Sequence, residues 1–200
     1  MMVGSQASTI TFGNFTGGTS HVLTGSGGNL AAGSGFAALG VFGIDDAAIS
    51  AAGASGDFSG VKAGFTQFGN SLTVGFNNLD GLFQGLVNGA ISGGDAFAGN
   101  SVYAVVGNAS SLADSAELMV FKASSSFQAD PAPTDNINLN PANGSALIGS
   151  IGSTTLNGND FASYALAGGA GGGVDPVIPE PSSALLGLLG LGFVAFRRKR

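Results

Sequence analysis

The sequence predicts an all-β protein: a glycine-rich antiparallel β-sandwich or jelly-roll-like body, followed by a flexible glycine-rich linker and a short C-terminal transmembrane helix. Short runs of β-branched and aromatic residues alternate with turn signals, and the body shows no long helical period. Gly accounts for 36 of the 200 residues, which suits frequent turns. The 15 Phe and an apolar content of 44% supply a core and argue against disorder.

The first half of the chain contains strand-like runs that glycines bound. Residues 35–42 are almost wholly apolar, which is typical of a buried strand. Two later runs flank the pair Gly69-Asn70, a combination that favours a tight hairpin turn. The strands predicted here cover residues 9–15, 21–24, 35–42, 64–68 and 71–76.

The second half continues in the same way. Residues 101–106 are the clearest strand, because they are β-branched and aromatic and end at Gly107-Asn108. Prolines punctuate residues 130–140, which indicates a loop. The further strands predicted here cover residues 117–122, 146–149 and 164–167.

The last part of the chain changes character at residue 168. Residues 168–178 are dominated by glycine and indicate a flexible linker. Pro179 and Pro181 stop any helix from upstream, and the 15 residues 182–196 are almost purely apolar. As a helix they would reach about 22 Å, against about 30 Å for the hydrocarbon core of a membrane. The segment is therefore short for a permanent anchor.

The C-terminal basic cluster is Arg197, Arg198, Lys199 and Arg200. Lysine and arginine directly after an apolar span mark its cytoplasmic end, so the body is expected outside the cytoplasm. Together Pro179, Glu180, Pro181, the apolar span and this cluster resemble a PEP-CTERM sorting signal over residues 179–200. The alternative is an ordinary C-terminal anchor with a chance Pro-Glu-Pro.

The resemblance implies a bacterial protein that is exported and processed. In that family the tail is recognised by an exosortase, a membrane-embedded cysteine transpeptidase, with Pro179, Glu180 and Pro181 as the recognition element. It implies transient anchoring in the inner membrane through the C-terminal helix, followed by display at the cell surface or release. The bodies attached to such tails show a similar glycine-punctuated layout, and the resemblance implies no activity for this one.

The N-terminal residues lack the basic region and apolar run of a signal peptide. The small residues 4–8 are typical of the region around a cleavage site, so we interpret residues 1–8 as the remnant of such a region and expect the true start upstream. The predicted organisation is then a cleavage remnant, an extracellular body, a linker and a sorting signal, at residues 1–8, 9–167, 168–178 and 179–200.

Charge and cysteine content exclude several functions. Residues 1–178 hold only Lys62 and Lys122 against eleven carboxylates, a net charge of −9. Nucleic acid is therefore excluded as a partner, because its phosphates need a basic surface. The chain has no cysteine, which rules out disulfides, thiol catalysis and cysteine-based zinc sites within it.

Candidate chemistry is sparse. His21 is the only histidine, and Ser20 beside it would point to the opposite face of a strand, so the two cannot share a proton. No cofactor is expected, although carboxylates could coordinate calcium; solvated acidic turns are the alternative. The calcium candidates are Asp45 with Asp46, Asp95, Asp114 with Glu117, and Asp130 with Asp135.

The sequence is compatible with three functions. We favour an exported, non-enzymatic protein of the cell surface or extracellular matrix. A carbohydrate-binding module associated with exopolysaccharide is the alternative, since the many asparagine amides could bind sugar hydroxyls; amides equally suit turns. A hydrolase with dispersed carboxylates is the third, because a glycosidase needs only two acids on one cleft.

Overall fold

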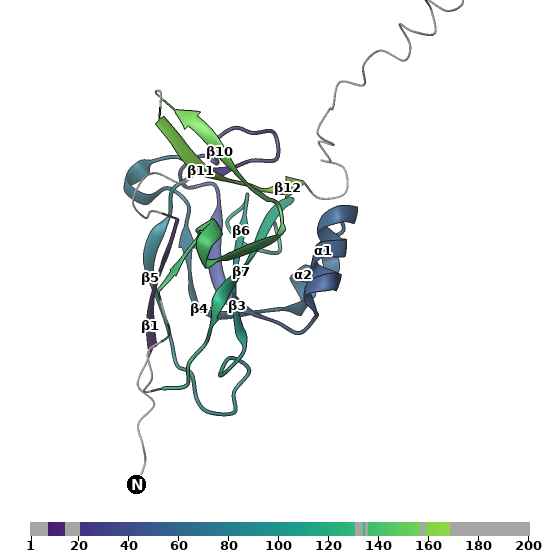
Figure 1. Ribbon diagram of the computed structural model, residues 1–200, viewed down its shortest axis with the longest axis vertical. Helices are drawn as coiled ribbons and strands as arrows, with labels where there is room; N and C mark the ends of the chain where they lie inside the picture. Colours follow the sequence, from purple (N-terminus) through teal and green to yellow (C-terminus); the bar gives the residue numbers. More distant parts are fainter. Residues whose placement is uncertain (1–7, 15–20, 131–133, 135, 157–158, 169–200) are drawn as a thin grey trace, which may run out of the picture.

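The computed structural model describes residues 8–14, 21–130, 134, 136–156 and 159–168, and of residues 153–156 and 159–161 it describes the backbone alone. These residues form mostly β-strands arranged in three sheets, with few helices (Figure 1). The predicted predominance of β-structure is thus confirmed, while the sandwich or jelly-roll assignment stays a prediction. The strands are β1 Ser8–Gly13, β2 His21–Leu23, β3 Phe36–Phe42, β4 Phe65–Thr73, β5 Gln84–Gly89, β6 Ser101–Gly107, β7 Glu117–Ser126, β8 Ile137–Asn138, β9 Gly144–Ile148, β10 Ser150–Leu156, β11 Asn159–Ala165 and β12 Ala167–Gly168.

The largest sheet has the order β12-β7-β6-β3-β4, with β9 also paired to β7, and every pair in it is antiparallel. Its central strands are buried on both faces. In β3, for example, Phe36 and Ala38 join one hydrophobic cluster while Ala37 and Leu39 join the other. Burial on both faces explains why these strands are nearly continuous apolar runs rather than alternating ones.

A smaller sheet with the order β5-β1-β8 covers one face of the large sheet. Ile10 and Phe12 of β1 and Val87 of β5 share a core with Leu39 and Phe121 of the large sheet, and all five are buried. A third sheet, β10-β11-β2, adds Val22 and Tyr164 to the same core. The β1–β8 and β11–β2 pairs are parallel, so the predicted antiparallel arrangement holds for the remaining pairs.

Two helices, α1 (Asp46–Ser55) and α2 (Ser59–Gly64), cover the other face of the large sheet. Ile49 of α1 and Val61 of α2 are fully buried against Val105 and Val120. Figure 1 shows both helices on the flank opposite β1 and β5. The molecule therefore has a helical side and a small-sheet side, with the large sheet between them. Two short 3-10 segments, η1 (Phe76–Asn78) and η2 (Pro141–Asn143), complete the elements.

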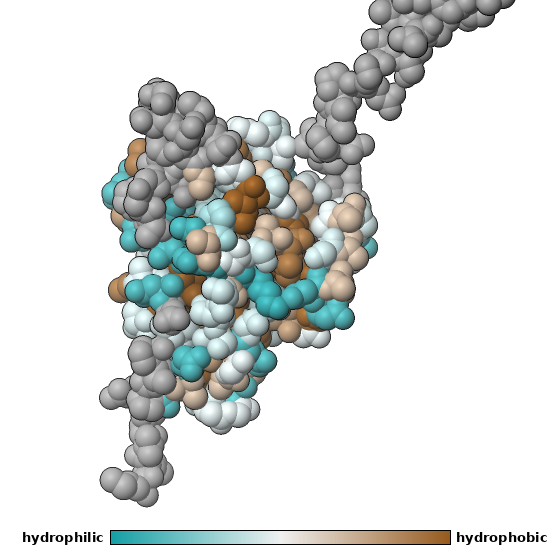
Figure 2. All heavy atoms as spheres, viewed as in Figure 1, coloured by the Kyte–Doolittle hydropathy of each residue, from teal (hydrophilic) through white to brown (hydrophobic). Residues whose placement is uncertain are grey.

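The helix α1 departs from the predicted all-β body, although the sequence shows no long helical period there. Ile49 is the only buried residue of α1, and alanine and serine cover its outer surface, which is pale brown to white in Figure 2. Such a helix has almost no apolar periodicity to detect. Its end signals were nevertheless present: Asp45 caps the N-terminus, accepting from the N–H of Ala48 at 2.8 Å, and Gly56 closes the C-terminus with φ of 71°.

The predicted hairpin around Gly69-Asn70 is wrong, because residues 65–73 form the single strand β4. Gly69 has φ of 60° and produces a bulge, seen as a register shift against β3 between Ala37 and Leu39. The side chain of Asn70 accepts from the N–H of Asn88 at 3.0 Å and donates to the carbonyl of Leu86 at 3.2 Å. These contacts turn the chain locally toward β5 instead of reversing it.

Candidate functional site

The residues of the predicted sorting signal, Pro179, Glu180, Pro181 and the basic cluster at 197–200, lie outside the described residues, as does the linker after residue 168. The described chain ends at β12, where Gly168 pairs with Glu117 of β7. Ala167 packs against the cluster that α1 and α2 share. The chain therefore leaves the body on its helical side, beside α1 in Figure 1. Neither helix within this described part has the length and apolarity needed to cross a membrane.

Among the calcium candidates, two acids form turns within the described chain. Asp45 caps α1 as described above. Asp95 accepts the N–H groups of Ser92 at 2.6 Å and Phe97 at 2.8 Å. The backbone hydrogen bond from Ala98, the largest effect, lowers the pKa of Asp95 below its ordinary value. Both carboxylates thus satisfy backbone donors that a turn or helix end leaves open.

Asp114 and Glu117 likewise hold separate segments. Ser111 donates its hydroxyl to Asp114 at 2.7 Å, while Glu117 accepts from the N–H of Gly25 at 3.0 Å. The structure shows each of these acids in its own local contact rather than in a shared site.

Asp130 accepts from the N–H of Ile91 at 3.1 Å and from the hydroxyl of Ser8. Its proposed companion Asp135 lies outside the described residues. Among the residues that the structure describes, no group of three or more histidine or acidic side chains is arranged to hold a metal ion.

His21 is also placed by a structural contact. Its Nδ1 lies 3.1 Å from the carbonyl oxygen of Asp80, which can only accept, so Nδ1 carries the proton in this contact. The Asp80 carboxylate in turn accepts from the N–H of Ala32 at 2.8 Å. His21 therefore connects β2 to the loop before β5. Ser20, the neighbour that suggested a Ser/His pair, lies outside the described residues.

Sequence reasoning missed one polar cluster, formed by Asp46 of α1, Tyr103 of β6 and Lys122 of β7. The Lys122 ammonium lies 2.6 Å from one oxygen of the Asp46 carboxylate, and the Tyr103 hydroxyl donates to the other at 2.7 Å. The ammonium also lies 5.7 Å from the centre of the Tyr103 ring, and Phe42 packs edge-on against that ring. A lone lysine inside a strand-like run was the one sequence signal for it.

The electrostatics of this Asp46 cluster favour ionised Asp46, charged Lys122 and neutral Tyr103. The hydrogen bond from Lys122 is the main cause that lowers the pKa of Asp46, and the same bond raises the pKa of Lys122. Burial is the main cause that raises the pKa of Tyr103, followed by its bond to Asp46. The pKa of each group is thus shifted further from neutral pH, whereas an acid or base catalyst needs a pKa near neutral pH.

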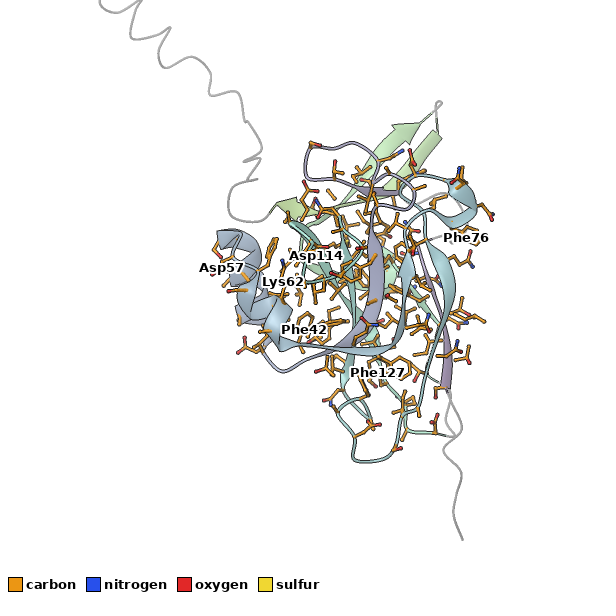
Figure 3. All side chains as sticks on the ribbon, turned by 180° about the vertical axis from the view of Figure 1, so that it is seen from behind. Phe42, Asp57, Lys62, Phe76, Asp114 and Phe127 are labelled. Atoms are coloured by element: carbon orange, nitrogen blue, oxygen red, sulfur yellow. The ribbon has the colours of Figure 1, made fainter. Side chains whose placement is uncertain are left out.

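The other lysine of the body is engaged as well. Lys62 of α2 donates to the carbonyl oxygens of Ser115 at 2.7 Å and Ala113 at 3.0 Å. Figure 3 shows Lys62 directed at the loop that carries Asp114. Both lysines of residues 1–178 therefore join the helices on the outer face to the large sheet and its loops. The arrangement supports a structural role for these polar groups.

Comparison with known proteins identifies the C-terminal part of the chain. A family model described as the PEP-CTERM protein-sorting motif matches residues 177–200. Neither a curated protein nor a solved structure matches the chain. The match covers the Pro-Glu-Pro residues, the apolar run and the basic cluster on which the sequence resemblance was based. The chain thus carries a PEP-CTERM sorting motif, which marks it as an exported protein that an exosortase sorts.

Proposed function

We propose that the protein is a non-enzymatic component of the cell surface or extracellular matrix. The sorting motif at residues 177–200 carries this proposal, because it directs the chain out of the cytoplasm. The body supports it through the use of its ionisable side chains. Asp45, Asp95 and Glu117 accept backbone N–H groups, and Lys62 donates to backbone carbonyls.

The membrane step is transient in this proposal. The apolar residues 182–196 hold the precursor in the inner membrane, with the cations at 197–200 on the cytoplasmic side. Cleavage near Pro179, Glu180 and Pro181 then frees the body. Because four of the six cations lie at 197–200, cleavage separates them from the acidic residues 1–178, whose net charge is −9. Mutual repulsion of such acidic bodies favours solubility outside the cell.

The proposal is tested by fractionating cells that express the full chain and measuring the intact mass of the product. We compare wild type with a triple variant, Pro179→Ala, Glu180→Ala and Pro181→Ala. The matched control changes three linker residues just before the motif: Val174→Ala, Asp175→Ala and Pro176→Ala. Wild type and control should reach the surface or medium with a mass that ends near residue 181. The motif variant should keep its full mass and stay in the membrane fraction.

Two results would overturn the proposal. Finding the wild-type chain uncut in the cytoplasm would show that it is not sorted to the surface, and the proposal would lose its basis. Turnover of polysaccharide or peptide substrates by the purified wild-type protein would remove the non-enzymatic assignment. Circular dichroism must first show a β-rich fold, so that an unfolded preparation is not taken for a protein without activity.

A further inference from the structure

The outer surface of the small sheet carries a continuous set of uncharged side chains, all polar except Leu86, which we call the amide face. Ile10, Phe12 and Val87 point into the core, so the alternate positions of β1 and β5 point outward. The register places Thr9 beside Asn88 and Thr11 beside Leu86. The amide face consists of Thr9, Thr11, Gln84, Leu86, Asn88, Asn136 and Asn138.

The amide face offers hydrogen-bonding groups that the protein itself leaves available. Asn88 accepts from the Thr9 hydroxyl at 2.8 Å through its side-chain oxygen, and Asn136 accepts from the N–H of Thr11 at 3.2 Å through its own. In each asparagine the side-chain NH₂ carries two further donors. Within the described part of the chain, no partner is recorded for either NH₂ group or for the side chain of Gln84. Thr9, Asn88 and Asn136 are all exposed.

The chemistry of the amide face selects one class of partner. It carries no cation, so phosphate, sulfate and uronate groups have nothing to pair with, and the −9 charge of residues 1–178 repels them. Its single large apolar side chain is Leu86, which is 54% exposed. Protein interfaces have apolar or aromatic centres, which one leucine among amides and hydroxyls does not provide. A neutral polymer rich in hydroxyl groups matches amide donors and hydroxyl acceptors arranged around a small apolar contact.

The position of the amide face suits such a partner. The chain leaves the body at β12, and Ala167 packs on the cluster that includes Ile49 and Val61 on the helical side. The amide face lies beyond the other side of the large sheet, and Figures 1 and 3 show β1 on the flank opposite α1. A body held through residues 169–200 therefore has its amide face on the side away from the point of attachment.

From these observations we infer that the amide face binds neutral polysaccharide. Asn88 and Asn136 donate to sugar hydroxyls, the Thr9 hydroxyl accepts, and Leu86 contacts the apolar face of a sugar ring. The biological setting of this binding rests on the export proposed above, but the binding itself does not. The two ideas are therefore separable by experiment.

The test uses the full-length chain in mild detergent and native electrophoresis through gels that contain a polysaccharide. The probes are dextran and laminarin as neutral glucans, with polygalacturonate as an anionic polymer. The test variant is Asn88→Asp with Asn136→Asp, which keeps both accepting oxygens but removes both NH₂ groups. The matched control is Asn108→Asp with Asn143→Asp, which adds the same charge elsewhere; Asn108 also accepts backbone N–H groups, from Ala116 and Glu117.

Wild type and control should be retarded by a neutral glucan and not by polygalacturonate. The test variant should bind that glucan about tenfold or more weakly, because the two hydrogen bonds donated by the asparagine amides are lost. Absence of retardation by both glucans, or equal retardation of test variant and control, would overturn the inference. The inference would also be overturned if sedimentation showed that wild type and control form a dimer and the test variant does not. The amide face would then bind a second copy of the chain. Failure of export in cells, with glucan binding intact, would count against the proposed function alone.

Discussion

The carboxylate of Asp46 lies 2.6 Å from the ammonium of Lys122, although 76 residues separate them in the chain. The pair joins the first turn of α1 to β7, and the Tyr103 hydroxyl ties the same carboxylate to β6. Since Ile49 is the only fully buried side chain of α1, this contact adds a polar attachment beside it at the start of the helix.

The first prediction concerns the strength of this pair. Removing it by Asp46→Asn should lower the free energy of unfolding by about 0.2 to 1 kcal/mol, the range typical of solvent-exposed ion pairs. The side chains are 33% and 39% exposed, so water weakens the attraction. A double-mutant cycle with Lys122→Met, followed by urea denaturation, isolates the coupling between the two residues. A coupling of zero would show that the contact contributes nothing to stability.

The second prediction concerns pH. The pKa of Asp46 is lowered from 3.8, so its contribution is complete above that value and is lost as pH falls through the lower folded pKa. The pKa of Lys122 is raised from 10.5, so its contribution is complete below 10.5 and is lost as pH rises through the higher folded pKa. The pKa of Tyr103 is raised from 10.0, so its contribution to stability is likewise lost as pH rises above 10.0.

The Asp46→Asn variant should therefore show a flatter stability profile than wild type on both the acid and the alkaline side. Thermal unfolding followed from pH 2 to 11 measures this. Asp95→Asn is the comparison, because the pKa of Asp95 is lowered by backbone hydrogen bonds and should affect the acid side alone. Profiles of wild type and Asp46→Asn that run parallel would contradict the assignment.

The third prediction concerns the bulge in β4. In Gly69→Ala, the new Cβ would lie 2.3 Å from the carbonyl oxygen of Asn88, at a residue with φ of 60°. Both the clash and the backbone conformation oppose the substitution, so the protein should lose about 1 to 3 kcal/mol of stability. Gly93→Ala is the control, since nothing lies within 4 Å of its added Cβ. Equal urea midpoints for the two variants would contradict the close approach of Gly69 in β4 to Asn88 in β5.

The fourth prediction concerns the attachment of α1. Ile49 is fully buried among Phe58, Val105 and Val120, so Ile49→Ala should lower the free energy of unfolding by about 2 to 4 kcal/mol. The adjacent Ser50 is exposed, and Ser50→Ala should leave stability nearly unchanged. Hydrogen exchange should also show faster opening of residues 46–55 in the Ile49 variant. Equal exchange in both variants would mean that the helix is held elsewhere.

Local patterns were enough to predict most strands of the large sheet. Residues 35–42 and 101–106 are long apolar runs, and they form β3 and β6 nearly as expected. Residues 84–89 were not predicted, because β5 begins and ends in Gln and Gly and has only Leu86 and Val87 as apolar residues. β5 is a strand because it pairs with β1 and because Asn70 bonds to its backbone, and both partners are distant in sequence.

The C-terminal signal could be read from the sequence alone because each part acts locally. The signal consists of proline at 179 and 181, apolar residues at 182–196 and cations at 197–200, and their order and spacing can be recognised in the sequence. The family match to residues 177–200 confirms that reading.

The sequence by itself therefore determined that this is a mostly β, acidic, exported protein with a C-terminal sorting motif. Only the tertiary structure decided that Asp46 meets Lys122, that Gly69 bulges β4 toward β5, and that Thr9 and Asn88 share a surface. The reason is physical: these relations depend on strand register and helix packing across many residues. Such pairings are settled by the whole core at once and leave no periodic trace in either segment.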